Sequence, residues 1–250
     1  MRLFGKLCSW PCGINLFRPR HLKAEPCASA CLTLHQFAEA LGNAVDAKDP
    51  QLYNHSHDVA ETGVILATGM RLSPSEIDLI DIAGHLHDIG KIGIPDEVLK
   101  KRGALNENEW RWMRRHPEIG AEIVRPVPSF NIAGGVANII LGHHEHYDGS
   151  GYPQGLQGEA IPLGARIVAV ADTLSALLRD RPYRRGCTFD KAFTEIKRCS
   201  GTQFDPAVVR ILEKSRQEVR EMLVSPDSAC NLRFLERDPE MLQIQPLSDY

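Results

Sequence analysis

The stretch LGARIVAVADTLSALL, residues 163–178, is apolar around most of its circumference when it is drawn as a helix. A helix of this kind is surrounded by other elements, so we predict a central helix here. Asp172 lies within the stretch, and burying a carboxylate without a partner costs on the order of several kcal/mol. Such a side chain is tolerated when it binds a metal ion or pairs with a cation, for which Arg166 is a candidate.

The segments on both sides of this helix predict an all-α domain. Ser73, Pro74 and Glu76 form a helix start, with a serine cap, a proline in the first turn and a glutamate that closes a capping box. Pro117 disfavours helical geometry in the residue before it, so the helix starting at 106 is predicted to end near His116. Helices are predicted over residues 32–47, 51–70, 73–87, 106–116, 131–144, 163–178, 189–199 and 206–223, with almost no strand signal.

Composition narrows the classes of function. The chain has 250 residues, of which 43% are hydrophobic, and a formal net charge of −3. This charge does not favour a nucleic-acid polymer or an anionic membrane as a partner. No stretch approaches the roughly 20 apolar residues that cross a bilayer. Arg2 and Lys6 interrupt the short apolar start, which is unlike a signal peptide. We therefore expect a cytoplasmic protein.

Loss of periodicity at both ends sets the expected domain boundaries. We predict an N-terminal extension over residues 1–30, one domain over 31–224 and a C-terminal tail over 225–250. Four cysteines near the N-terminus have a paired spacing that could suit a zinc site. Free thiols in a reducing compartment are the simpler interpretation, because no turn signal accompanies the cysteines. These four are Cys8, Cys12, Cys27 and Cys31.

Eight of the ten histidines lie between His55 and His146. The pairs HD at 87–88 and HH at 143–144 each end an apolar segment of helical pattern. Imidazoles and carboxylates together form a ligand set that suits iron, manganese, zinc or nickel. Simpler interpretations remain open, with His55 as a surface helix residue and the HH pair as a solvated helix end that complements the helix dipole.

The stretch HHEHYDGSGYP, residues 143–153, joins the paired histidines to a glycine-rich loop. Such a stretch is either a polar surface turn or a metal site beside a loop that approaches a ligand closely. Gly149 and Gly151 permit backbone geometry that is closed to other residues, and Pro153 stiffens the turn.

Four separated motifs occur in order along the chain: HLHDIGKIGIPDEVL, HPEIGAEI, HHEHYDGSGYPQGLQGEAIPLGARIVAVAD and DRPYR. With these motifs, residues 35–220 resemble the HD-GYP domain, a branch of the HD metal-dependent phosphohydrolases. The resemblance implies an all-α, HD-superfamily helical bundle with a metal centre in its core. It also implies a phosphoric diester hydrolase that converts the bacterial second messenger cyclic di-GMP to linear pGpG and then to GMP.

The resemblance assigns seven side chains to metal binding. One ion would be held by His55, His87, Asp88 and Asp172, and a second by Asp88, His116, His143 and His144. The expected cofactors are two divalent transition metal ions, iron or manganese, with zinc or nickel as alternatives. Two such ions can bind a bridging water, lower its pKa and clamp the phosphate oxygens, so Asp88 would be catalytic as the bridge. Neighbouring residues point about 100° apart on a helix, so the HH pair needs a helix end to serve one ion.

The resemblance also assigns contacts with the substrate. Lys91 would face the substrate phosphate, whose negative charge grows in the transition state; the alternative is a solvent-facing lysine. Tyr152, beside Gly151, would stack on guanine or hydrogen-bond to it. Arg181 and Arg184 would contact phosphate and guanine, because the planar guanidinium matches both groups. The alternative for these arginines is a basic surface loop.

Four positions depart from the family pattern. Gln51 stands where members with a third metal carry a carboxylate, so two metals are expected. Asp58 replaces a usual arginine, His146 stands where arginine or lysine is common, and Ser175 replaces a second aspartate. These three changes put in doubt the surroundings that orient the metal ligands.

Three functions therefore stay open. The first is a cyclic di-GMP phosphodiesterase. The second is a catalytically degenerate module that binds nucleotide or a protein partner without turnover. The third is a phosphohydrolase for another cyclic dinucleotide, such as cyclic GMP-AMP. The resemblance further implies GGDEF-type or other signalling proteins as partners of the GYP loop.

Overall fold

The computed structural model describes residues 34–48, 54–101, 103–179 and 186–224. Within these ranges the chain is helical, and its β pairing consists of one isolated bridge. The all-α prediction is confirmed. Among the helices so described, none combines the length and the apolar character needed to cross a membrane.

Six helices lie close to where the sequence predicts them. They are α1 (Leu34–Lys48), α2 (His55–Gly69), α3 (Pro74–Leu86), α7 (Val136–Gly142), α8 (Leu163–Leu178) and α9 (Phe189–Arg198). The predicted capping box at the start of α3 is present, because Ser73 and Glu76 each accept a hydrogen bond from the other's backbone N–H. α7 is shorter than predicted, since its regular turns begin only after Gly134, which has a φ of 70°.

The predicted helix that starts at 106 and stops near His116 is present, because Asn106 caps α5 (Glu107–Met113), which ends three residues before that histidine. The sequence analysis did not predict the separate helix, α6 (His116–Val124), that begins at His116. Pro117 lies in the first turn of α6, where a helix needs no backbone N–H, so this proline starts a helix instead of ending one.

The long C-terminal helix predicted over 206–223 is also wrong in detail. It is two helices, α10 (Pro206–Lys214) and α11 (Arg216–Val224), which Ser215 separates. The short elements are η2 (Ile89–Gly93), α4 (Asp96–Leu99), η3 (Pro128–Phe130) and η4 (Gly158–Ala160).

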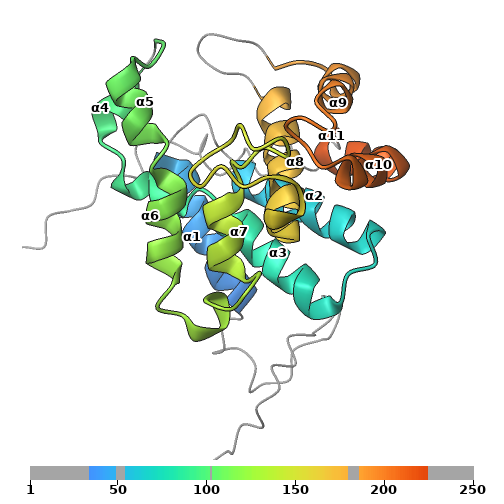
Figure 1. Ribbon diagram of the computed structural model, residues 1–250, viewed down its shortest axis with the longest axis horizontal. Helices are drawn as coiled ribbons and strands as arrows, with labels where there is room; N and C mark the ends of the chain where they lie inside the picture. The colour runs from blue at the N-terminus through green and yellow to red at the C-terminus, as the bar shows by residue number, and fades with distance from the viewer. Residues whose placement is uncertain (1–33, 49–53, 102, 180–185, 225–250) are drawn as a thin grey trace, which may run out of the picture.

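α8 is the central helix that the sequence predicts. It packs against α2, α3, α7 and α9, as Figure 1 shows. Complete burial of an aliphatic side chain contributes about 1.5–3 kcal/mol, so the packing of α8 anchors the bundle and fixes the position of Asp172. Its side chains with 0% exposure are Ala165, Ile167, Val168, Val170, Ala171 and Leu174.

Two glycines allow the segments that carry histidines to approach closely. A Cβ atom on Gly84 of α3 would lie 2.5 Å from the Cα atom of Ala60 in α2. A Cβ atom on Gly90 of η2 would lie 1.9 Å from the carbonyl oxygen of His116, at the start of α6. Any larger residue would push these segments apart, so both glycines are required by the packing that assembles the site.

Candidate metal centre

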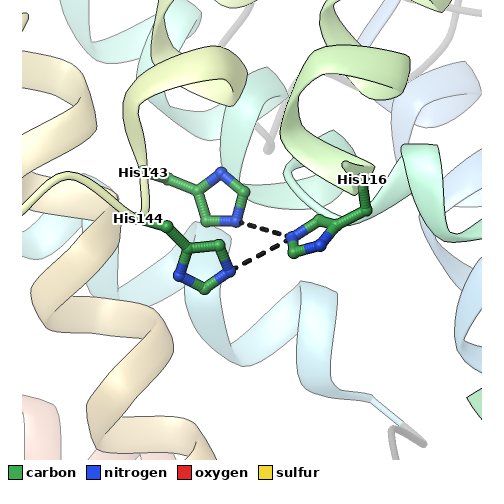
Figure 2. A group of neighbouring side chains, drawn as sticks. All are labelled: His116, His143 and His144. Carbon is green, nitrogen blue, oxygen red and sulfur yellow. Dashed lines mark hydrogen bonds between the residues drawn. The ribbon is translucent and has the colours of Figure 1, made fainter. Parts of the chain in front are cut away.

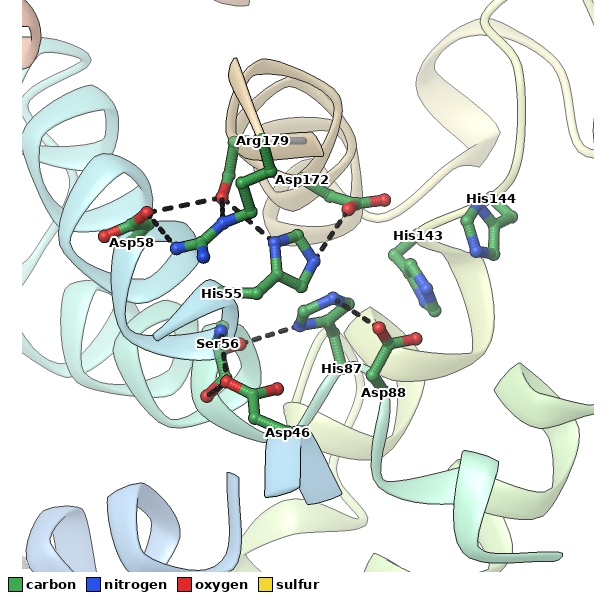
Figure 3. Close-up of polar contacts among 12 residues, drawn as sticks. Asp46, His55, Ser56, Asp58, His87, Asp88, His143, His144, Asp172 and Arg179 are labelled. Atoms are coloured by element: carbon green, nitrogen blue, oxygen red, sulfur yellow. Dashed lines mark hydrogen bonds and ion pairs between the residues drawn. The ribbon is translucent and has the colours of Figure 1, made fainter. Parts of the chain in front are cut away.

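Six side chains form two neighbouring groups in which each residue offers one ligand atom. In both groups the ligand atoms lie within 4.8 Å of one another. Figure 3 shows the first group pointing toward Asp172 of α8, with two histidines of the second group beside it. The first group is His55, His87 and Asp88, and the second is His116, His143 and His144.

Helix ends bring these residues together. His55 and His116 are the first residues of α2 and α6, and His87 and His143 are the caps that follow α3 and α7. Because side chains at a helix end are not confined to one face, His144 can reach the same place as its neighbour. The helix end that we expected from the adjacent histidines is therefore present at the end of α7.

The first group is buried and closely spaced. His55 is 2% exposed, and its Nε2 lies 3.1 Å from Oδ1 of Asp172. The interpretation of His55 as a surface residue is therefore wrong. Pairing of Asp172 with Arg166 is also wrong, because the Arg166 guanidinium lies 2.6 Å from Oδ2 of Asp205.

The second group is drawn in Figure 2, where the three imidazoles face one another. The Nε2 atom of His116 lies 3.4 Å from Nε2 of His143 and 3.1 Å from Nε2 of His144. His143 is 1% exposed, so the interpretation of this pair as a solvated helix end is wrong.

Asp88 joins the two groups. Its Oδ2 lies 3.3 Å from Nε2 of His87, and its Oδ1 lies 3.3 Å from Nε2 of His116. Lys91 Nζ donates to the same Oδ2 at 2.6 Å, and the lysine side chain is 15% exposed. The alternative of a solvent-facing lysine is therefore wrong.

Hydrogen bonds to backbone carbonyls orient three of the histidines so that their Nε2 atoms face the centre. The Nδ1 atoms of His87, His116 and His143 lie 2.6–2.8 Å from the backbone carbonyl oxygens of the residues three positions earlier. Since a carbonyl only accepts, each Nδ1 carries a proton, and in His116 and His143 the Nε2 lone pair faces the centre. Nε2 of His87 is buried, and its contact with Asp88 at 3.3 Å lacks hydrogen-bond geometry. Bound cations would satisfy the facing lone pairs and would replace the proton of His87, so the residues fit a metal centre.

Burial keeps the second group neutral. It lowers the pKa of His116 to about 4 and that of His143 to about 3. It also lowers the pKa of His144 well below the ordinary value, and the neighbouring histidines act in the same direction. Neutral imidazole is the form that binds metal ions.

The first group holds charge. Burial alone would lower the pKa of His87, but Asp88 and Asp172 outweigh burial and raise it to about 9. Burial would raise the pKa of Asp88, but Lys91 and His87 outweigh burial and hold it well below the usual range. A cation that binds to the first group is therefore attracted by the carboxylates of Asp88 and Asp172, and it displaces a proton from His87.

The neutral second group predicts acid sensitivity of the metal-free protein. Between pH 6.5 and about 4 the unfolded chain binds protons at His116, His143 and His144 that the folded chain does not. Stability decreases as the pH is lowered wherever the unfolded state binds more protons, so the Tm of chelator-treated protein should fall as the pH goes from 6.5 to about 4. Circular dichroism melts at several pH values measure it. His144→Asn should show a smaller fall, and equal falls in both proteins would contradict the assignment.

Three polar side chains form a network behind His55. Ser175 Oγ lies 2.9 Å from Nδ1 of His55 and accepts from Nε of Arg179 at 3.2 Å. The hydroxyl donates toward Asp58 at 3.5 Å, and Arg179 forms an ion pair with the same carboxylate. Because the hydroxyl donates toward Asp58, its lone pairs accept from Nδ1 of His55, and Nε2 of His55 faces Asp172 and the centre. Two departures from the family pattern, Asp58 and Ser175, thus belong to one network that orients a candidate ligand.

Ser175→Ala is expected to weaken cation binding by about 10- to 100-fold, the usual effect of removing a group that orients a ligand. The reason is that the His55 ring loses the acceptor that fixes its protonation and angle. Calorimetric titration of chelator-treated protein with Mn²⁺ measures the affinity. Thr173→Ala, on the same helix, is the control, and an affinity of Ser175→Ala equal to that of the control would rule the network out.

Glu145 is a buried acid to which the sequence analysis assigns no role. It is 2% exposed, and its carboxylate accepts from the backbone N–H groups of Gln154 and Leu156 at 2.6 and 3.0 Å. The signal was available, since an acid between buried histidines and a glycine-rich loop needs donors and the loop amides need acceptors. Glu145 therefore fastens the loop to the metal centre.

The loop glycines have two different roles. Gly149 has a φ of 85°, which agrees with the expected backbone geometry. At Gly151 the constraint is steric, because a Cβ atom would lie 2.2 Å from the backbone nitrogen of His146. This approach places Tyr152 against His144, with ring centroids 4.9 Å apart and planes inclined by 25°. His146 itself hydrogen-bonds Ser150 within the loop.

Several expectations fall outside the described residues and stay predictions. These residues are Gln51, Arg181, Arg184, Cys8, Cys12, Cys27 and Cys31.

Comparison with known proteins agrees with the geometry. The family model described as HD domain matches residues 39–208. The cyclic di-GMP phosphodiesterase response regulator RpfG of Xanthomonas campestris pv. campestris is 43% identical over 182 residues, which are 73% of this chain and 48% of that protein. The 3'3'-cGAMP-specific phosphodiesterase 2 of Vibrio cholerae is 39% identical over 172 residues, which are 69% of this chain and 33% of that protein. The chain spans less than half the length of these curated relatives.

A solved structure shares the fold. The crystal structure of a cyclic GMP-AMP specific phosphodiesterase of V. cholerae, V-cGAP3, aligns with a TM-score of 0.62 at 22% sequence identity. The alignment covers 83% of this chain and 54% of that chain.

Proposed function

Because the chain belongs to the HD domain family, in its HD-GYP branch, we propose that it hydrolyses cyclic di-GMP at this metal centre. The observation that carries the proposal is the contact of Asp88 with both groups of histidines. One carboxylate shared in this way sets the spacing of two cation sites, which suits the hydrolysis of a phosphate ester.

We propose two divalent ions, iron or manganese, with zinc or nickel as alternatives. Their contribution would be to make water nucleophilic at neutral pH and to neutralise charge on the phosphate. The two groups of histidines and carboxylates would hold them, with Asp172 completing the first group and Asp88 shared. Metal content per chain, measured on protein purified without chelators, tests the number.

Other residues of the chain would contact the substrate. Lys91 puts an ammonium 2.6 Å from Oδ2 of Asp88, beside the place where a phosphate oxygen would gain negative charge. Water would add to phosphorus and the bond to the ribose 3′ oxygen would break, which opens the ring to pGpG. A second hydrolysis would give two GMP molecules. Tyr152 would contact a guanine, and Arg181 and Arg184 would contact the phosphate or base.

The experiment is an assay of purified protein loaded with Mn²⁺ or Fe²⁺ against cyclic di-GMP and 3'3'-cGAMP, with products separated by chromatography. Conversion of cyclic di-GMP to pGpG and GMP is the expected result. Tight binding without product would favour the degenerate module. Faster hydrolysis of 3'3'-cGAMP would favour the other substrate, which the name of the V. cholerae relative supports.

We also propose a protein partner for the glycine-rich loop. A loop fastened by Glu145 presents a fixed surface, which would suit a signalling protein of the GGDEF type. We also propose residues 31–224 as the folded unit; the family match lies inside these bounds.

A further inference from the structure

A row of planar side chains leads away from the metal centre. His144 stacks on Tyr152, as described above. The guanidinium carbon of Arg114 lies 5.6 Å from the centroid of the Tyr152 ring and 5.9 Å from that of Trp110. Trp110 is 45% exposed. The row thus begins at a candidate metal ligand and ends at an indole that is nearly half open to solvent.

Local sequence fixes this arrangement. Trp110 and Arg114 are four residues apart at the end of α5, so their side chains share one face of the helix. Arg114 is the cap that follows α5, two positions before His116. The turn between α5 and α6 therefore positions both His116 at the metal centre and Arg114 beside Tyr152. Figure 1 shows α5 at the edge of the bundle, next to α6.

Arg114 places a positive charge beside the metal centre. Its guanidinium contacts the Tyr152 ring, which also stacks on the candidate metal ligand His144. A substrate phosphate near Tyr152 would find this positive charge in a protein whose net charge of −3 offers no general attraction.

We propose that Trp110 and Arg114 form a nucleotide subsite for the half of the cyclic dinucleotide that is not being cleaved. An exposed indole stacks on any purine face, and a guanidinium pairs with a phosphate through its planar fork. The inference rests on the proposed function, because it takes a cyclic dinucleotide as the ligand.

The chain supplies a matched control. Arg115 stacks on Trp112, with its guanidinium carbon 5.0 Å from the ring centroid, and Trp112 is 43% exposed. The two tryptophans thus have similar exposure and similar cationic neighbours. They differ in that Arg114 also reaches Tyr152, so a subsite should depend on one pair and not on the other.

The experiment uses the full chain loaded with Mn²⁺ and compares Trp110→Ala, Arg114→Ala, Trp112→Ala and Arg115→Ala. The Kd is measured by calorimetry with a phosphorothioate analogue of cyclic di-GMP that resists hydrolysis, and kcat and KM are measured for cyclic di-GMP and for bis(p-nitrophenyl) phosphate, a diester without a nucleobase. Loss of base stacking corresponds to about a tenfold rise in Kd. We expect that rise for Trp110→Ala and Arg114→Ala, with a smaller change in KM for the small diester and unchanged metal content. The controls should stay within about twofold of the unmodified protein.

Equal effects of the Trp110 and Trp112 variants would overturn the subsite, and so would a Kd unchanged by both Trp110→Ala and Arg114→Ala. The proposed hydrolysis is judged separately. If the unmodified protein binds cyclic di-GMP without cleaving it, the hydrolase proposal fails, while the difference in Kd between the two pairs still decides the subsite. Circular dichroism spectra confirm that the variants are folded.

Discussion

Asp88→Asn is expected to abolish hydrolysis and to reduce the metal content of both groups together. Asp88 is the residue whose two oxygens lie 3.3 Å from Nε2 of His87 and from Nε2 of His116. An amide has one oxygen and no charge, so it cannot serve two cations at once. Loss of a group that merely orients a ligand costs about 10- to 100-fold in metal affinity or activity, so loss of this shared carboxylate should cost more than about 100-fold.

Elemental analysis and the rate with cyclic di-GMP measure both effects on the same sample. Asp190→Asn is a matched control, because that carboxylate makes ion pairs on the surface, where such pairs contribute little. It should keep the metal content and rate of the unmodified protein. Full metal content in Asp88→Asn would contradict the shared site, even if the rate fell.

Lys91→Met is expected to slow hydrolysis by about 100- to 1,000-fold, the usual cost of removing one donor that stabilises transition-state charge. Methionine keeps much of the apolar stem of lysine and removes the ammonium. Metal content should be retained, since lysine is not a ligand and its departure leaves Asp88 free for cations. The effect should appear in kcat, with a smaller change in KM.

Lys100→Met is the control for this prediction, because Lys100 pairs with Asp96 and is half exposed. It should leave kcat within about twofold of the unmodified protein. A Lys91→Met variant with unchanged kcat would assign the lysine to holding Asp88 in place, and a loss of metal would assign it to the assembly of the centre.

The helices and the ligand residues could be predicted largely from sequence because both depend on strong, local patterns. The capping box at Ser73 and Glu76 and the apolar run of α8 predict elements that the structure contains. Buried histidines and acids at the ends of apolar segments need partners, and this requirement predicts their convergence. The structure brings together all seven side chains that the family resemblance assigned to metal binding.

What the sequence did not predict depends on contacts between distant segments or on an ambiguous local signal. Pro117 is compatible with the end of one helix and with the start of the next, and the structure has both, since α5 ends at Met113 and α6 begins at His116. Asp58 interacts with Ser175 and Arg179, which lie more than a hundred positions later in the chain, so Asp58 and Ser175 each looked like a departure from the family. Glu145 was missed although its signal is local, because its donors, the backbone N–H groups of Gln154 and Leu156, lie in the loop that follows it.

The first and last candidate ligands, His55 and Asp172, are far apart in the sequence, and cations at this centre would tie α2, α3, α6, α7 and α8 at a single point. Each ion would then act as a removable cross-link, strengthening the native state by an amount that grows with the free ion concentration. A cell that runs short of the metal would lose more than turnover, because a larger fraction of its copies would open and become accessible to proteases. The supply of one inorganic nutrient would in this way set how long the protein lasts as well as how fast it works.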